Sequence, residues 1–150
     1  MELSYTLLAD GSSDRGLIPI LTWMLKRHVP HCAVQSRWAD LRRLRNPPAT
    51  LEGRIETAVR LYPCSLLFIH RDAERESRQS RVSEIANSLA NTSRRDLPHV
   101  LVVPVRMTET WLLFDEIAIR RAAGNPNGKM PLNLPRLKDL DASAAPEKHL

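Results

Sequence analysis

The chain has 150 residues, of which 43% are hydrophobic and 26% charged, and its formal net charge is +5 at pH 7. This composition is typical of a globular domain, and two cysteines are too few for a disulfide framework. No run approaches the roughly 18 apolar residues of a membrane span. Residues 1–4 do not begin a basic segment followed by an apolar one, so we expect no signal peptide, a cytoplasmic location and no membrane contact.

The first half of the chain predicts two strands, each followed by a helix. Residues 3–9 are apolar on both faces and predict a strand, and the apolar spacing over 14–28 predicts an amphipathic helix. Pro19 lies within the first turns of this helix and would move its start to about Ile18. A short strand over 32–35 follows, and then a helix over 50–62, with Thr50 as its N-cap.

The second half repeats this alternation. Strands are expected over 65–69 and 100–105, with Pro104 at the end of the second because a central strand position needs an N–H. Helices are expected over 74–91 and 108–123, and Gly124 is a C-cap. Beyond it the chain is rich in turn residues and proline. We therefore predict one domain over 1–124 and a Pro-rich C-terminal extension over 125–150.

Alternation of strands and helices predicts an α/β domain with a mostly parallel sheet of four strands. Strands that are apolar on both faces are expected where helices cover both sides of the sheet. The predicted architecture is therefore a Rossmann-like domain of three layers.

Acidic residues follow two of the predicted strands. Asp10 comes after the first strand, and Asp72 and Glu74 come after the third. In open α/β sheets, ligands bind in the crevice at the carboxyl ends of the strands. Three carboxylates in one crevice repel one another unless a cation compensates them. The sequence therefore predicts a site for a divalent cation.

These acidic segments resemble the TOPRIM fold, the family of DnaG-type primases, topoisomerases and OLD-family nucleases. Its motif is an acidic residue that closes the first strand before a glycine turn, and a later strand that ends in Asp-x-Asp. Asp10 stands where the family usually has Glu, and Glu74 where it usually has Asp. The match looks closest to small, uncharacterised bacterial TOPRIM-like proteins and covers roughly residues 3–140. It is also carried by Glu-Thr-Trp-Leu-Leu-Phe-Asp at 109–115 and by residues 120–128.

The resemblance implies an enzyme that uses Mg²⁺ or Mn²⁺ to cleave phosphodiester bonds in nucleic acid, in bacterial anti-phage defence or DNA repair. It implies Asp10, Asp72 and Glu74 as catalytic residues and metal ligands, with general-base work carried over to Asp10 as a hypothesis. Glu109 is either a further metal ligand or a carboxylate at a helix N-terminus, where the helix dipole favours it. Asp10 and Glu74 each differ from the family residue by one methylene, which favours metal binding over fast catalysis.

Basic residues suggest where nucleic acid would bind. The predicted nucleic-acid-binding residues lie between the second strand and the second helix, and beside the second acidic segment: Arg37, Arg42, Arg43, Arg45, Arg71 and Arg75. The first group is equally well interpreted as a solvated loop.

A second interpretation comes from a different functional class. The chain would be a catalytically weak nucleic-acid-binding or regulatory subunit, with an ATPase as partner or as a homo-oligomer. Primase-like nucleotidyl transfer is a third interpretation, and it is disfavoured because the chain has no recognisable zinc-binding domain.

Overall fold

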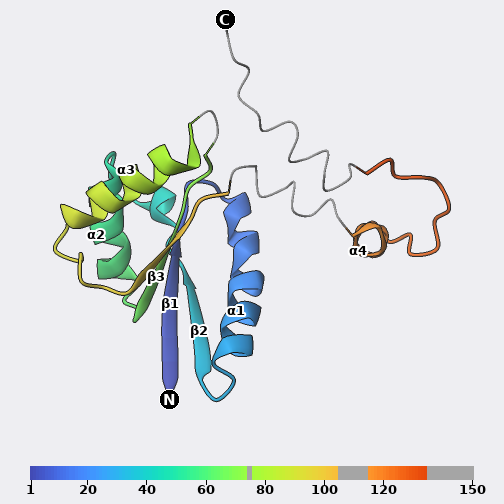
Figure 1. The fold of residues 1–150 in the computed structure, drawn as a ribbon, viewed down its shortest axis with the longest axis horizontal. Coiled ribbons are helices and arrows are strands. Elements are labelled where there is room, and N and C mark those ends of the chain that lie inside the picture. The colour runs from blue at the N-terminus through green and yellow to red at the C-terminus, as the bar shows by residue number, and fades with distance from the viewer. Residues whose placement is uncertain (74–75, 105–114, 135–150) are drawn as a thin grey trace, which may run out of the picture. The chain divides into compact units, whose positions relative to one another are not determined.

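A computed structural model describes residues 1–73, 76–104 and 115–134 (Figure 1). The chain divides into two compact units, Met1–Pro104 and Val105–Leu150. Our boundary after Gly124 remains a prediction about domain organisation. Within the described residues, no helix combines the length and the hydropathy needed to cross a membrane.

The first unit is built on a sheet of four parallel strands in the order β2-β1-β3-β4. These strands are β1 (Glu2–Leu8), β2 (Ala33–Trp38), β3 (Leu66–His70) and β4 (His99–Val102). The helices are α1 (Leu17–His28), α2 (Leu51–Leu61) and α3 (Arg78–Ala90). The predicted α/β class and four-stranded parallel sheet are therefore confirmed.

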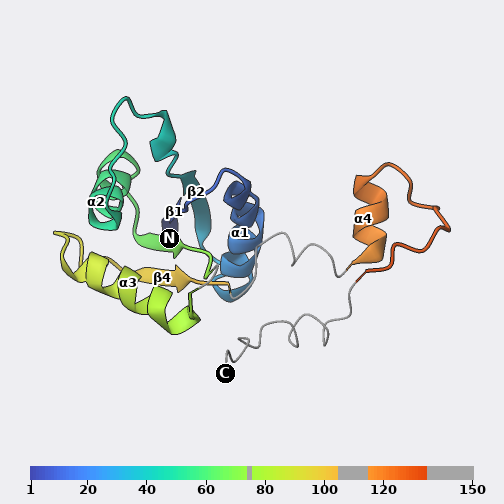
Figure 2. The same ribbon diagram turned by 90° about the horizontal axis from the view of Figure 1, so that it is seen from above.

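Helices cover both faces of this sheet, as Figures 1 and 2 show. Side chains alternate along β1, so Tyr5 and Leu7 pack with α1 while Leu8 packs with α2 and α3. Tyr5 also donates a hydrogen bond of 2.9 Å from its hydroxyl to the carbonyl of Ile18, and its ring meets Phe68 edge-on at 5.3 Å. Two apolar cores therefore fix the central strands β1 and β3, whose carboxyl ends carry the predicted site.

Three strand or helix boundaries differ from the sequence predictions. The fourth strand runs over His99–Val102 and ends before residue 105, where the sequence predicted its end. The other two differences have local reasons. The third helix begins at Arg78 and not at residue 74, because the Ser77 hydroxyl accepts a hydrogen bond of 3.0 Å from the Ser80 amide and caps it. The second strand runs over Ala33–Trp38 and not 32–35, because the exposed edge strand lacks the apolar pattern that marks a buried one.

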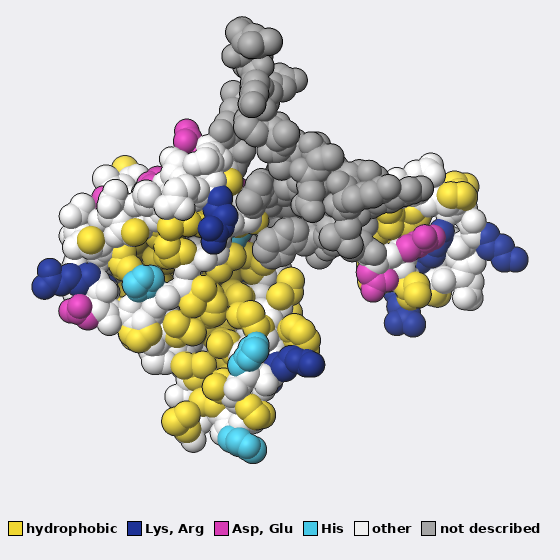
Figure 3. All heavy atoms as spheres, viewed as in Figure 1, with side chains coloured by type: hydrophobic (Ala, Val, Ile, Leu, Met, Phe, Trp, Pro, Cys, Tyr) yellow, Lys and Arg dark blue, Asp and Glu magenta, His cyan; other side chains and the backbone are white. Residues whose placement is uncertain are grey.

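The first helix is preceded by a 3₁₀ turn, Ser13–Gly16, and begins at Leu17. Pro19 therefore falls in its first turn, where a missing N–H costs nothing. Its outer face exposes Ile20 and Trp23. In the view of Figure 3, hydrophobic side chains gather over the lower part of the first unit, and the Lys and Arg side chains drawn there are scattered.

The described part of the second unit contains α4 (Glu116–Ala122). The Asp115 carboxylate caps it by accepting a hydrogen bond of 3.0 Å from the Ala118 amide. Gly124 follows its C-terminus with φ of +69°, a conformation that favours glycine. The predicted cap at Gly124 is confirmed. The earlier part of the predicted helix over 108–123 lies outside the described residues.

Candidate active site at the carboxyl ends of the central strands

Acidic residues from β1 and β3 lie at the same edge of the sheet. The two strands are parallel neighbours, with Leu8 paired to Ile69, so the segments that follow them start side by side. The connections leave these two strands in opposite directions: the chain runs from β1 to β2 on one side of the sheet, and from β3 to β4 on the other. Such a topological switch point is where open α/β sheets bind ligands. Asp10 and Asp72 follow these two strands directly and lie at this edge of the sheet.

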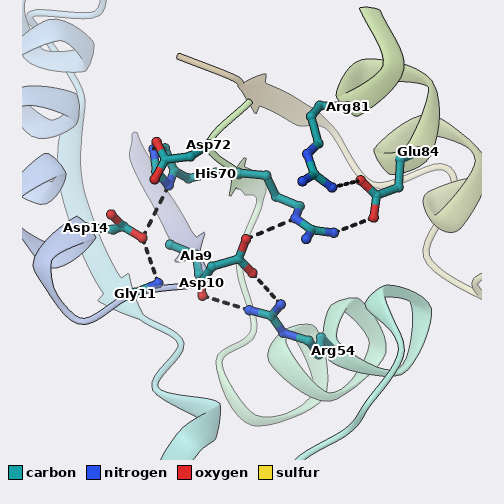
Figure 4. Close-up of polar contacts among 10 residues, drawn as sticks. Ala9, Asp10, Gly11, Asp14, Arg54, His70, Asp72, Arg81 and Glu84 are labelled. Carbon is teal, nitrogen blue, oxygen red and sulfur yellow. Dashed lines mark hydrogen bonds and ion pairs between the residues drawn. The ribbon is translucent and has the colours of Figure 1, made fainter. Parts of the chain in front are cut away.

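The Asp10 carboxylate lies between two guanidinium groups. Nη1 of Arg54 is 2.5 Å from Oδ1, and Nε of Arg71 is 3.0 Å from Oδ2 (Figure 4). Arg54 also donates a hydrogen bond of 2.8 Å from Nη2 to the Ala9 carbonyl. Both carboxylate oxygens of Asp10 are therefore engaged by cations.

These contacts extend into a chain of alternating charges, which we call the charge network: Arg54, Asp10, Arg71, Glu84 and Arg81. Arg71 contacts Glu84 through Nη1 at 2.5 Å, and Arg81 contacts the other oxygen of Glu84 at 2.9 Å. The network joins α2, β1, the end of β3 and α3.

The charge network acts on the acidity of Asp10. Partial burial raises the pKa of this carboxyl, but hydrogen bonds and charge from Arg54 and Arg71 outweigh it and hold the pKa below its ordinary value of 3.8. Asp10 is therefore ionised at neutral pH, and it is a weak proton acceptor.

A second group, which we call the histidine cluster, lies on the other side of the crevice and consists of Asp14, His70 and Asp72. Nδ1 of His70 is 3.4 Å from Oδ2 of Asp14, and Nε2 is 3.7 Å from Oδ1 of Asp72. His70 and Asp14 are buried, with 1% and 4% of their surface exposed. The Asp14 carboxylate also accepts a hydrogen bond of 2.8 Å from the Gly11 amide.

The imidazole of His70 thus lies between two carboxylates. In Figure 4, Asp72 lies beside His70, whereas Asp10 points toward Arg54. The turn between β1 and α1 is fixed by the Gly11–Asp14 hydrogen bond, and a Cβ on Gly11 would come within 3.3 Å of the Asp14 carboxylate. The histidine cluster therefore orders both the turn and the start of the segment after β3.

The predicted metal ligands are only partly described. Glu74, Glu109 and the predicted nucleic-acid contact Arg75 lie outside the described residues. Among the residues that are described, no three His, Cys, Asp or Glu side chains are arranged to hold a metal ion. In this arrangement Asp10 is better suited to pair with arginines than to bind a metal ion, because both of its oxygens contact arginines. Asp72 can still offer a hard oxygen donor at this edge of the sheet.

The predicted basic residues lie in different environments. Arg71 belongs to the charge network, and Arg37 donates a hydrogen bond of 2.9 Å to the Pro63 carbonyl. Arg42 and Arg43 both pair with Asp40, at 3.3 and 2.9 Å. Arg45 is exposed in the following loop. The structure does not join these residues into one surface.

Sequence reasoning missed Arg81 and Glu84 of the charge network, and it also missed Arg54. It lies in the first turn of α2, where a positive charge is disfavoured by the helix dipole. In a parallel sheet, a helix that follows a strand begins at the carboxyl edge, so its first turn borders the crevice. An arginine in the first turn of a helix that follows a strand is therefore the sequence signal by which Arg54 could have been found.

Two cavities are found at opposite ends of the sheet. One of about 250 Å³ adjoins the candidate site and includes Asp10 and Arg54 in its wall. The other, about 470 Å³, is lined by residues near the amino end of β3, such as Pro63 and Cys64. The larger cavity has neither Asp10 nor Asp72 in its lining, and the smaller one lies at the edge where this class of sheet binds ligands.

Comparisons with known proteins supply no relative. No family model, no curated protein and no solved structure matches the chain. Evidence about the site therefore comes from the residues of this chain alone.

Proposed function

We propose that the protein is a Mg²⁺- or Mn²⁺-dependent enzyme that cleaves phosphodiester bonds in nucleic acid, with a TOPRIM-like site. The observation that supports this best is the pairing of β1 with β3, because each strand leads directly into acidic residues at a topological switch point. The net charge of +5 suits a polyanionic substrate. Anti-phage defence or DNA repair is the context that the resemblance suggests.

Within this proposal, Asp72 and Glu74 would hold the metal, with Glu109 as a further ligand. A bound Mg²⁺ would supply Lewis-acid polarisation of a phosphoryl oxygen. Asp72 is 28% exposed at its side chain and lies beside the buried His70, which restricts its orientation. A carboxylate held in one orientation costs less to order when a ligand binds.

In this proposal Asp10 positions two arginines and is not the general base that its place in the TOPRIM motif suggests. The lowered pKa makes it a poor general base, since a proton acceptor works best with a pKa near the operating pH. Its negative charge instead holds Arg54 and Arg71 at the crevice. Guanidinium groups bind phosphate oxygens in a forked geometry, so these arginines are suited to the substrate backbone.

A nuclease assay tests the proposal. Single- and double-stranded DNA and RNA are incubated with the protein and Mg²⁺ or Mn²⁺, beside Asp72→Asn and the matched control Asp96→Asn. Asp96 is 97% exposed at its side chain, on the loop between α3 and β4. We expect cleavage that Asp72→Asn lowers at least 100-fold and that Asp96→Asn leaves intact. Absence of cleavage by the unaltered protein, or equal cleavage by both variants, overturns the proposal.

A second candidate function is a nucleic-acid-binding or regulatory subunit with little catalysis. It is favoured by one observation, the occupation of both Asp10 oxygens by arginine. This function predicts nucleic-acid binding that EDTA does not weaken, together with no cleavage under any metal. It also accommodates an ATPase partner or a homo-oligomer.

A further inference from the structure

The smaller cavity carries a combination of groups that points to a specific ligand. It has a volume of about 250 Å³ and lies between the carboxyl ends of β1 and β2, the loop that follows β2, and the first turn of α2. The residues that line it include two arginines, one aspartate, one tryptophan and two prolines: Arg42, Arg54, Asp10, Trp38, Pro47 and Pro48. We call it the edge pocket.

The cationic side of the edge pocket can bind an anion. Arg54 uses two of its five N–H groups in its contacts with Asp10 and Ala9. Arg42 pairs with Asp40 through Nε, at 3.3 Å, and its side chain is 52% exposed. A guanidinium keeps further N–H donors in a fixed plane, so both arginines can also donate to phosphate oxygens.

The other side of the edge pocket is apolar. Trp38 is half-buried at the end of β2, where its partner in β1 is Leu7. It packs against the apolar core on the α1 face of the sheet and also borders the edge pocket. Pro47 and Pro48 have no side-chain charge and restrict the chain that forms the opposite wall. Flat or ring-shaped apolar groups of this kind bind the face of a nucleobase.

The volume limits the ligand to one small unit. Typical pockets for drug-sized molecules measure about 300–1,000 Å³, so the edge pocket is below this range. A base pair does not fit, whereas a single nucleotide has the matching size, one anionic end and one aromatic end. The pocket also shares Asp10 and Arg54 with the candidate active site.

We propose that the edge pocket binds one unpaired nucleotide of the substrate strand, with its phosphate on Arg42 and Arg54 and its base against Trp38 and the prolines. This inference rests on the proposed function and deepens it, because it restricts the substrate to single-stranded or unpaired nucleic acid.

Calorimetric titration without metal tests the pocket itself. AMP, adenosine and inorganic phosphate are titrated separately in EDTA into the full chain, Arg42→Ala, and the control Arg60→Ala. Arg60 is an exposed residue on the same helix as Arg54, and the Arg60→Ala substitution removes one positive charge, as Arg42→Ala does. We expect AMP to bind more tightly than either fragment, and Arg42→Ala to weaken AMP about 10-fold while Arg60→Ala changes it less than twofold. No AMP binding, or equal loss in both variants, overturns the inference.

The aromatic wall has its own test. Trp38→Leu should weaken AMP at least fivefold and leave inorganic phosphate unchanged, provided that its circular dichroism spectrum and melting curve show a folded protein. If Trp38→Leu does not fold, Trp38→Phe replaces it, with a smaller loss expected for AMP. Unchanged AMP affinity in a folded variant contradicts the assigned base position.

Cleavage assays separate this inference from the proposed function. With Mg²⁺, a single-stranded oligonucleotide should be cleaved faster than its blunt duplex, and Arg42→Ala should raise the KM for the single strand with little change in kcat. Cleavage that depends on Asp72 but is equal for both substrates and for Arg42→Ala overturns the edge pocket and leaves the proposed function standing. AMP binding as expected without any cleavage supports the pocket and overturns the nuclease.

Discussion

Asp10 and Arg54 are 44 residues apart in the chain, yet Oδ1 of one lies 2.5 Å from Nη1 of the other. The contact joins the end of the central strand β1 to the first turn of α2. Because Arg54 also binds the Ala9 carbonyl, it recognises both the backbone and the side chain of this turn. The pair therefore fixes where the acidic end of β1 lies.

Replacing Asp10 by Asn should destabilise the protein at neutral pH and much less at low pH. The folded-state pKa of Asp10 lies below 3.8, so its ionic contribution is complete above that value and disappears as the pH falls through the folded pKa. The side chain is 40% exposed, and solvent screening limits the loss to about 1 kcal/mol at pH 7. Urea unfolding at pH 7, 5 and 3 measures it. An equal difference at all three values would show that the ionised carboxylate is not responsible.

Arg54→Lys should separate the geometry of the contact from its charge. A lysine keeps the positive charge but lacks the planar fork that reaches Asp10 and the Ala9 carbonyl together. We expect a loss of about 1 kcal/mol in unfolding free energy and a rise in the pKa of Asp10. Carboxyl-carbon NMR titration follows that pKa directly. The matched control is Arg60→Lys on the exposed side of α2, and a similar change in both variants would contradict the prediction.

The buried imidazole of His70 should be important for stability. The imidazole lies between Asp14 and Asp72. Its replacement removes the contact of 3.4 Å between Nδ1 of His70 and the buried Asp14 carboxylate. We expect His70→Gln to lower the unfolding free energy by about 2–4 kcal/mol, measured by denaturant unfolding. His31→Gln, at an exposed turn, should change it by less than about 0.5 kcal/mol. Comparable stability of the two variants would argue against a structural role for the histidine cluster.

Two threonines of α2 should respond to alanine in opposite directions. The Thr50 hydroxyl accepts a hydrogen bond of 3.2 Å from the Gly53 amide and caps the helix, so Thr50→Ala should cost about 1 kcal/mol. Thr57 lies in the helix interior, where alanine has the higher helix propensity, so Thr57→Ala should stabilise by up to about 0.5 kcal/mol. Thermal melting of both variants checks the signs. Destabilisation by both would mean that packing, and not capping, dominates.

The strands of the buried centre could be predicted because they are apolar on both faces. Residues 3–9 and 65–69 agree with β1 and β3 within about one residue at each end, and their order along the chain gave the parallel sheet. The edge strand β2 was predicted too short because solvent-facing residues such as Gln35 and Arg37 hide its pattern. Local caps at Thr50 and Asp115 were predictable since a cap involves residues close in sequence.

The candidate site was only half predictable for a related reason. A strand that ends in a carboxylate is visible in the sequence, so Asp10 and Asp72 could be placed at one edge. The partners of Asp10 could not, because Arg71 and Arg54 lie 61 and 44 residues away and their contacts depend on the packing of α2 and β3. The contact between Asp14 and His70, which are 56 residues apart, could not be predicted for the same reason.

The strand order has a consequence for how the chain folds. β1 is the first strand to be synthesised, but both of its neighbours come later, and β3 is complete only at His70. At roughly 5–20 residues per second, the chain between Trp38 and His70 takes a few seconds to emerge. During that time one edge of an apolar strand has no partner, which is a condition that promotes association between nascent chains. Delayed pairing of β1 is therefore the step at which a chaperone would be of most use.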